Sequence, residues 1–146
     1  MGFQSIHSPE AENAILASFI IDENTRHLIE TLEPAGFYDP VNRKVFEAIR
    51  SLYRANRPID LLTIHETSKV DMARLTAYET PTSALTEHHI GILKDKAARR
   101  ELMAALQKIS KLLQEDLPRI ELKNEAMRIL ATIDIGSCQV DGSLRT

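Results

Sequence analysis

The longest helical signal in this 146-residue chain constrains its fold more than any other feature. From Ser83 to Glu115 there is no proline, and Gly91 is the one residue of the stretch that weakens a helix. Apolar residues recur within it at spacings of four, three and four, which is typical of a coiled-coil seam. These residues are Leu102, Leu106, Ile109 and Leu113. The stretch therefore predicts one long helix with a narrow apolar stripe.

A second seam with the same spacing follows after a short break. Asp116 and Pro118 interrupt the first helix and start another. The second seam consists of Leu122, Ala126, Ile129 and Ile133. Two helices joined by a few residues fold back as an antiparallel hairpin. Such a hairpin cannot bury both seams by itself, so we expect it to pack on the rest of the chain or on a second copy.

This reasoning gives a candidate interface for self-association or partner docking. Its residues are Leu102, Leu106, Ile109, Leu113, Leu117, Ile120, Leu122, Ile129 and Ile133. The ordinary alternative is that some of these side chains pack inside the chain's own core. A protruding hairpin with two apolar stripes would nevertheless leave more apolar surface than a monomer usually exposes.

The first half of the chain reads as a series of short helices with clear starts. Ser8, Asp22, Asp39 and Asp60 each stand where an N-cap is expected, and three of them have a proline or an apolar run directly behind. Residues 69–81 fit a short helix or a loop. The predicted fold class is all-α, a compact helical bundle followed by a C-terminal antiparallel helical hairpin. The predicted divisions are a globular part at 1–82, the hairpin at 83–134, and a tail or linker at 135–146.

Composition and charge exclude several functional classes. Hydrophobic residues make up 43% and charged residues 27%, a mixture typical of soluble globular domains. The sequence contains neither a membrane-spanning apolar run nor a signal peptide pattern. The single cysteine, Cys138, fits a reducing compartment. We therefore expect a cytoplasmic protein, either bacterial or phage-encoded and acting in the bacterial cytoplasm. The net charge of −3 argues against a domain that grips DNA by its phosphates, so any DNA contact is expected to be weak or indirect.

No residues form a recognisable reaction centre. A nucleotide-binding GxxxxGK loop is absent, and the five glycines are widely scattered. His88 and His89 point about 100° apart on a helix and cannot chelate one metal together. Glu10 with Glu12, and Asp22 with Glu23, are interpreted as helix-start acids that cap or stay solvated. We therefore expect no catalytic, cofactor or metal residues in this chain.

The densest basic cluster lies at the start of the long helix. It consists of Lys94, Lys96, Arg99 and Arg100. Asp95 lies four residues before Arg99, and Glu101 follows directly, so part of this charge is locally neutralised. A solvated helix surface is the favoured interpretation; a charged protein interface and a nucleic-acid contact are the alternatives. The arginines and the lysine between Arg43 and Arg57 call for the same interpretation.

Four landmarks of the chain resemble the N-terminal domain of DnaB-type replicative DNA helicases. The first is HSPEAENAIL at residues 7–16, and the second is FYDP at 37–40, followed by Arg43, Val45 and Phe46. The third is PIDLLTI at residues 58–64. The fourth consists of Ile92, Lys96, Arg100 and Leu102. They occur in the family's order across roughly residues 6–134.

The resemblance implies a scaffold rather than an enzyme. Such domains assemble as dimers that form a ring-shaped collar, and the collar receives the C-terminal domain of the primase or a helicase loader. ATP and magnesium belong to a RecA-like ATPase domain, which is absent before the sequence stops at Thr146. The segment from Ile64 to His88 is also shorter than usual and lacks the family's Gly-Gly and Tyr-Leu. This departure predicts a truncated or rearranged helix there.

Two other functions stay open at this point. The helicase-binding domain of a primase is related in fold, and would bind helicase hexamers instead of primase. A helical DNA-binding regulator is the other alternative, although no recognition-helix signature is present.

Overall fold

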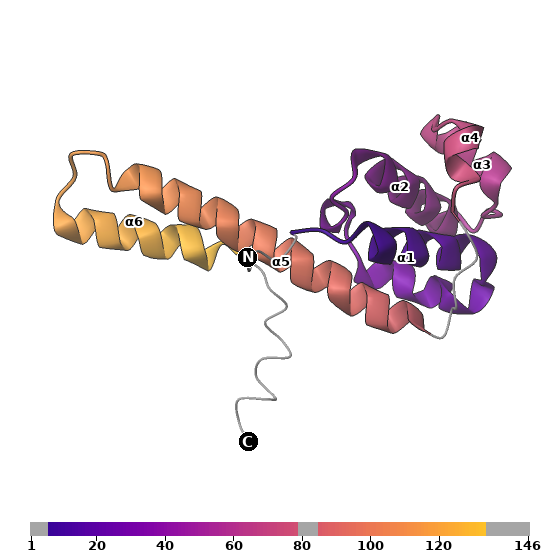
Figure 1. Cartoon of the computed structure of the whole chain (residues 1–146), viewed down its shortest axis with the longest axis horizontal. Helices are drawn as coiled ribbons and strands as arrows, with labels where there is room; N and C mark the ends of the chain where they lie inside the picture. Colours follow the sequence, from indigo (N-terminus) through magenta and orange to yellow (C-terminus); the bar gives the residue numbers. More distant parts are fainter. Residues whose placement is uncertain (1–5, 79–84, 134–146) are drawn as a thin grey trace, which may run out of the picture. The chain divides into compact units, whose positions relative to one another are not determined.

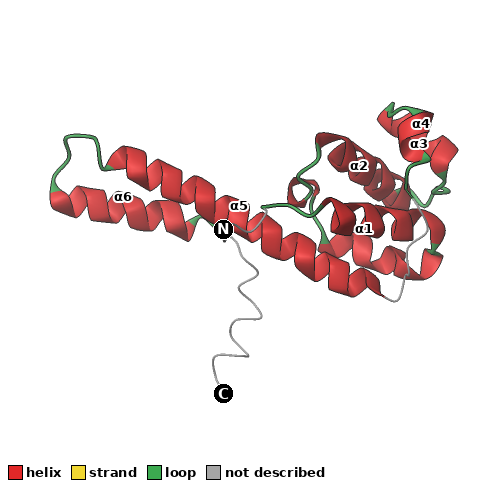
Figure 2. Ribbon diagram, viewed as in Figure 1, coloured by secondary structure: helices red, strands yellow, loops and turns green. Residues whose placement is uncertain are grey.

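The computed structural model describes residues 6–78 and 85–133, and every regular element within these ranges is a helix (Figures 1 and 2). Four elements build the first half: α1 at Pro9–Ile21, η1 at Glu23–Thr31, η2 at Pro34–Gly36, and α2 at Pro40–Arg54. Four more follow: α3 at Leu61–Ser68, α4 at Met72–Leu75, α5 at Thr86–Leu112, and α6 at Arg119–Ala131. Here η denotes a 3-10 helix. The all-α fold class is confirmed.

Side-chain caps begin the helices where the sequence predicts them. The Ser8 hydroxyl accepts from the Ala11 amide at 3.2 Å, and Asp39 accepts from the Val41 amide at 2.8 Å. Asp60 forms a capping box with Thr63, in which each side chain accepts from the other residue's amide. These bonds satisfy backbone donors that the first helical turn leaves without partners. Asp22 also caps as predicted, but the element that it starts, η1, is a 3-10 helix.

Three aromatic rings lie at the centre of the core. Phe37 stacks on Phe46 with 4.9 Å between ring centroids, and Phe19 lies 6.4 Å from the same ring. All three are fully buried. Aliphatic side chains from α1, α2 and α3 complete the cluster around them: Ile15, Leu16, Val45, Ile49, Leu52 and Ile64. Burial of this set provides the main favourable free energy of folding.

The chain divides into two compact units, at residues 1–97 and 98–146. The first unit extends beyond the predicted division between residues 82 and 83, because the start of α5 packs into its core. Ile90 and Leu93 are buried in the core cluster, and the Thr86 hydroxyl donates to the Ser18 hydroxyl at 3.0 Å. The predicted division itself, like the predicted tail at 135–146 with Cys138, lies outside the described residues.

The second unit contains the last turns of α5 and all of α6. Within it, α6 runs back alongside the end of α5, as the antiparallel hairpin prediction requires (Figure 1). Leu112 ends α5, and the turn that follows is closed by backbone bonds such as Leu113 N to Ile109 O at 3.0 Å. Pro118 is the N-cap residue of α6. Of the stretch 69–81, for which the sequence predicts a short helix or a loop, residues 69–78 contain the short α4, and the remainder lies outside the described residues.

Gly91 allows the helix propensity of α5 to be tested at a position without packing contacts. It lies in the helix interior, and a Cβ atom added there would meet nothing within 4 Å. Because glycine loses the most backbone entropy in a helix, Gly91→Ala should raise the free energy of unfolding by about 0.5–1 kcal/mol. Urea unfolding followed by circular dichroism measures this change. The matched control is Lys94→Gly, at an exposed position one turn later, which should lower stability by a similar amount.

Candidate interaction surface

The hairpin of the second unit has an inward and an outward apolar stripe. The inward stripe on α5 contains the buried Ala105 with the half-buried Ile109 and Leu112, at a spacing of four and three. On α6 it consists of the half-buried Leu122, Ala126 and Ile129, and Ile133 follows the helix with similar burial. These positions are the less exposed apolar residues of the hairpin.

The outward stripe consists of large side chains that no other described segment of the chain covers. Their exposed fractions lie between 44% and 65%. They are Leu102, Met103, Leu106 and Leu113 on or directly after α5, and Ile120, Met127 and Leu130 on α6. Isolated exposed apolar residues are ordinary, whereas seven on one two-helix unit mark this unit as a candidate interaction surface.

The predicted interface residues divide between these two stripes. Leu102, Leu106, Leu113 and Ile120 lie in the outward stripe, whereas Ile109, Leu122, Ile129 and Ile133 are half-buried on the inward side. Leu117 is half-buried in the turn. On α5 two apolar stripes with helical spacing share Ile109. One is the predicted seam through Leu106, and the other runs through Ala105 and Leu112. The small Ala105, which the seam prediction passed over, occupies the inward one, and a small residue lets two helices approach closely.

The predicted basic cluster is divided by the boundary between the units. Lys94 and Lys96 belong to the first unit, and Arg99 and Arg100 belong to the second. Lys96, Arg99 and Arg100 have interaction partners in the structure, as does Asp95. The four residues therefore do not all belong to one compact unit.

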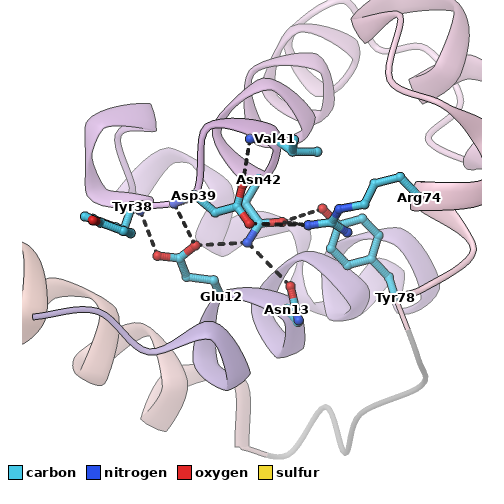
Figure 3. A network of polar contacts seen from close by, with 8 residues as sticks. All are labelled: Glu12, Asn13, Tyr38, Asp39, Val41, Asn42, Arg74 and Tyr78. Carbon is cyan, nitrogen blue, oxygen red and sulfur yellow. Dashed lines mark hydrogen bonds and ion pairs between the residues drawn. The ribbon is translucent and has the colours of Figure 1, made fainter. Parts of the chain in front are cut away.

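A buried polar network in the first unit centres on the Glu12 carboxylate (Figure 3). Glu12 is 1% exposed. It accepts from the Tyr38 amide at 2.7 Å, from the Asp39 amide at 3.3 Å, and from the Asn42 side-chain amide at 2.9 Å. Its negative charge thus lies against the N-terminus of α2, where backbone amides and the helix dipole stabilise an anion.

This finding corrects the interpretation of Glu12 as a solvated or capping acid at the start of its own helix. Glu10 is exposed there as predicted, but Glu12 points into the protein and caps a different helix. A signal for this was present in the sequence. Glu12 precedes the core residues Ile15, Leu16 and Phe19 by three, four and seven positions, so it lies on their helix face.

The Asn42 side chain extends the network to α4 and the residues after it. Its oxygen accepts from the Tyr78 hydroxyl at 2.6 Å and from the Arg74 guanidinium at 3.0 Å. Burial raises the pKa of Tyr78 to about 12, although the positive charge of Arg74 opposes the rise. Tyr78 therefore stays a neutral donor at any physiological pH. The network is a structural joint between α1, α2 and α4.

Other polar groups of the described residues do not assemble into a reaction centre. The rings of His88 and His89 lie 5.7 Å apart and tilted by 59°. Within residues 6–78 and 85–133, no three histidine, cysteine or acidic residues are grouped so that they could hold a metal ion. No helix within these ranges is both long enough and apolar enough to cross a membrane.

Comparison with known proteins identifies the family. The model of the DnaB-like helicase N-terminal domain matches residues 4–95, which is more than half of the chain. The chain belongs to this family. It is 34% identical over 110 residues to the replicative DNA helicase DnaB of Rhodothermus marinus, and 29% identical over 107 residues to that of Synechocystis. Each alignment covers 66% of this chain and 12% of the relative, so the chain spans about an eighth of those helicases.

The fold agrees with the family assignment. The crystal structure of the N-terminal domain of DnaB helicase from Mycobacterium tuberculosis superposes with a TM-score of 0.80 at 21% identity. The superposition covers 89% of this chain and all of that one. The matched region of the family is its non-catalytic N-terminal domain, and the match lies on the helicase side rather than on a primase.

The Glu12 network brings two of the sequence landmarks of this DnaB-like domain together. HSPEAE at residues 7–12 supplies the carboxylate, and FYDP at 37–40 supplies the two backbone amides that it binds. His7 also stacks on Tyr38 at 4.2 Å between ring centroids. The two motifs are 26 residues apart in the chain and form one joint in the fold.

Glu12→Gln tests the joint. An amide in place of the carboxylate turns one acceptor into a donor that faces other buried donors, so the free energy of unfolding should fall by about 1–3 kcal/mol. Urea unfolding measures the change. Glu10→Gln is the matched control, because that exposed side chain should change stability by less than about 0.5 kcal/mol. Equal effects of the two substitutions would contradict a special role for Glu12.

Proposed function

We propose that this chain is a non-catalytic assembly domain of a replicative DNA helicase. In this role it associates with copies of itself and docks the C-terminal domain of the primase or a helicase loader at the replication fork in the cytoplasm. The observation that supports the proposal most directly is the outward stripe of the hairpin, because seven large apolar side chains are exposed on one small unit. Family membership supports the helicase context.

The proposed mechanism is burial and tethering. Covering the outward stripe removes apolar surface from water, which favours association by about 25 cal/mol for each Å² buried. A second copy of the same hairpin is the occupant that we propose, because an identical apolar stripe is self-complementary in a two-fold arrangement. A ring of such domains would hold several primase molecules near the fork and raise their local concentration.

Nucleotide chemistry has no place in the proposed role of this chain. ATP and magnesium would be bound by an ATPase domain of the kind that replicative helicases carry. The scattered glycines of this sequence do not form a phosphate-binding loop. Contact with DNA would be weak or indirect, given the net charge of −3.

Leu106→Glu tests self-association through the outward stripe. Both copies carry the substitution, so two buried leucine contacts of about 1.5–3 kcal/mol each are lost, and the dimer should weaken by about a hundredfold or more. Analytical ultracentrifugation measures the dissociation constant, and circular dichroism checks the helix content. Gln107→Glu is the matched control, since it adds the same charge at the neighbouring exposed position outside the stripe. A monomeric wild-type chain at high concentration would refute the proposal.

Ile120→Glu tests the hairpin as the primase-docking surface. Ile120 is exposed at the start of α6, so the substitution should abolish retention of the primase C-terminal domain in a pull-down. Glu121→Gln, at the adjacent exposed position, should leave retention unchanged. Ultracentrifugation of the same variant distinguishes lost docking from lost self-association. Normal retention by Ile120→Glu would place the primase elsewhere.

A further inference from the structure

A second candidate surface is an open cavity of about 340 Å³ in the first unit. It lies between η1 and the segment that joins α2 to α3. Its lining residues are Glu23, Arg26, His27, Tyr53, Asn56, Arg57 and Ile59. This volume is at the lower end of the range for ligand pockets, roughly 300–1,000 Å³, and suits one or two side chains.

The turn after α2 presents Arg57 in a fixed backbone geometry. Asn56 has a left-handed conformation with φ of 58°. The Arg57 amide donates to Leu52 O at 2.9 Å, and the Asn56 amide donates to Tyr53 O at 3.1 Å. These two bonds define a Schellman motif, in which the position held by Arg57 usually carries an apolar residue that packs back on the helix. Here a charged and exposed side chain stands there instead.

Arg57 differs from the arginines of α2 in having no acceptor among the described residues. Arg43 donates to Phe37 O, Arg50 pairs with Glu33 at 3.3 Å, and Arg54 pairs with Glu30 at 2.8 Å. The Arg57 guanidinium makes no hydrogen bond or ion pair within residues 6–78 and 85–133. The positive charge of Arg57 at the cavity is therefore not paired with an acidic group of the described residues.

Arg26 adds a second, immobilised guanidinium to the cavity. Its Nε donates to Phe19 O at 2.8 Å, and its Nη2 donates to Ile20 O at 3.0 Å and to Ile59 O at 3.3 Å. These bonds fix the plane of the group and leave the two N–H bonds of Nη1 without an acceptor in the described part of the chain. Two guanidinium groups that line one cavity favour an anionic ligand, which relieves their mutual repulsion.

We propose that this cavity docks a carboxylate side chain from an acidic peptide segment of a partner protein. Arg57 binds the carboxylate by charge-assisted hydrogen bonds, and the half-exposed Tyr53 ring supplies apolar contact beside it. Tyrosine and arginine are the residue types that most often anchor protein interfaces. The Glu23 carboxylate lines the same cavity and repels any anion, so the proposal is limited to a single carboxylate group held by Arg57. The repeated phosphates of a nucleic acid fit less well, because a chain with a net charge of −3 repels such a polyanion more strongly. The proposal is independent of self-association through the hairpin.

Nuclear magnetic resonance of the ¹⁵N-labelled full chain tests the proposal. The probe is a capped peptide of sequence Ala-Glu-Leu-Glu-Ala, and the control is the same peptide with glutamine for glutamate. The glutamate peptide should shift the amide signals of Asn56, Arg57 and His27 saturably. Arg57→Gln should weaken binding by about tenfold, since it removes a charged hydrogen-bond donor. Arg54→Gln removes the same charge one turn earlier and should change the affinity by less than about twofold.

Four outcomes would overturn the proposal. The first is equal binding of the glutamine peptide, and the second is equal weakening by Arg54→Gln, which would indicate long-range attraction instead of a site. The third is tighter binding of oligothymidylate to the same residues, which would indicate a nucleic-acid surface. The fourth is no saturable shift up to about 10 mM peptide, a concentration above that at which weak single-site contacts saturate.

Discussion

The first unit depends on one buried carboxylate. Glu12 is held by two backbone amides and one side-chain amide, and it neutralises the positive end of α2 from another helix. A buried charge without such partners costs several kcal/mol, about as much as the whole margin of stability of a small domain. The angle and register between α1 and α2 are therefore tied to hydrogen-bond geometry as well as to the packing of Phe37 and Phe46.

Asn42 connects the Glu12 carboxylate to the α4 region. Its amide nitrogen donates to Glu12 and its oxygen accepts from Tyr78 and Arg74, so one side chain joins the carboxylate to the α4 region. Each atom of the amide has a defined role, and the orientation of the side chain is fixed by its partners. These hydrogen bonds connect the α4 region to α2 beside the apolar contacts of the buried Val70, Leu75 and Tyr78.

The two units hold their helices by different means, and this difference bears on function. The first has a core of fully buried aromatic and aliphatic side chains and a buried polar network around Glu12. In the second unit a narrow inward stripe is buried or half-buried, and an outward apolar stripe is exposed. Covering an apolar surface of this kind lowers the free energy of the system, which favours association. The proposed assembly role follows from that contrast, whereas the cavity at Arg57 offers a polar contact of a separate kind.

The sequence by itself determined the helices, their caps and the family. Ser8, Asp39 and Asp60 act locally, since a cap and its helix are a few residues apart, and the hairpin follows from two seams with a short turn. Only the tertiary structure decided which face of each helix is used. The spacing on α5 fits two registers that share Ile109, and burial of Ala105 selects one of them. Glu12 and Asn42 meet across some thirty residues of chain, a contact that no local pattern specifies, because it depends on how distant helices pack.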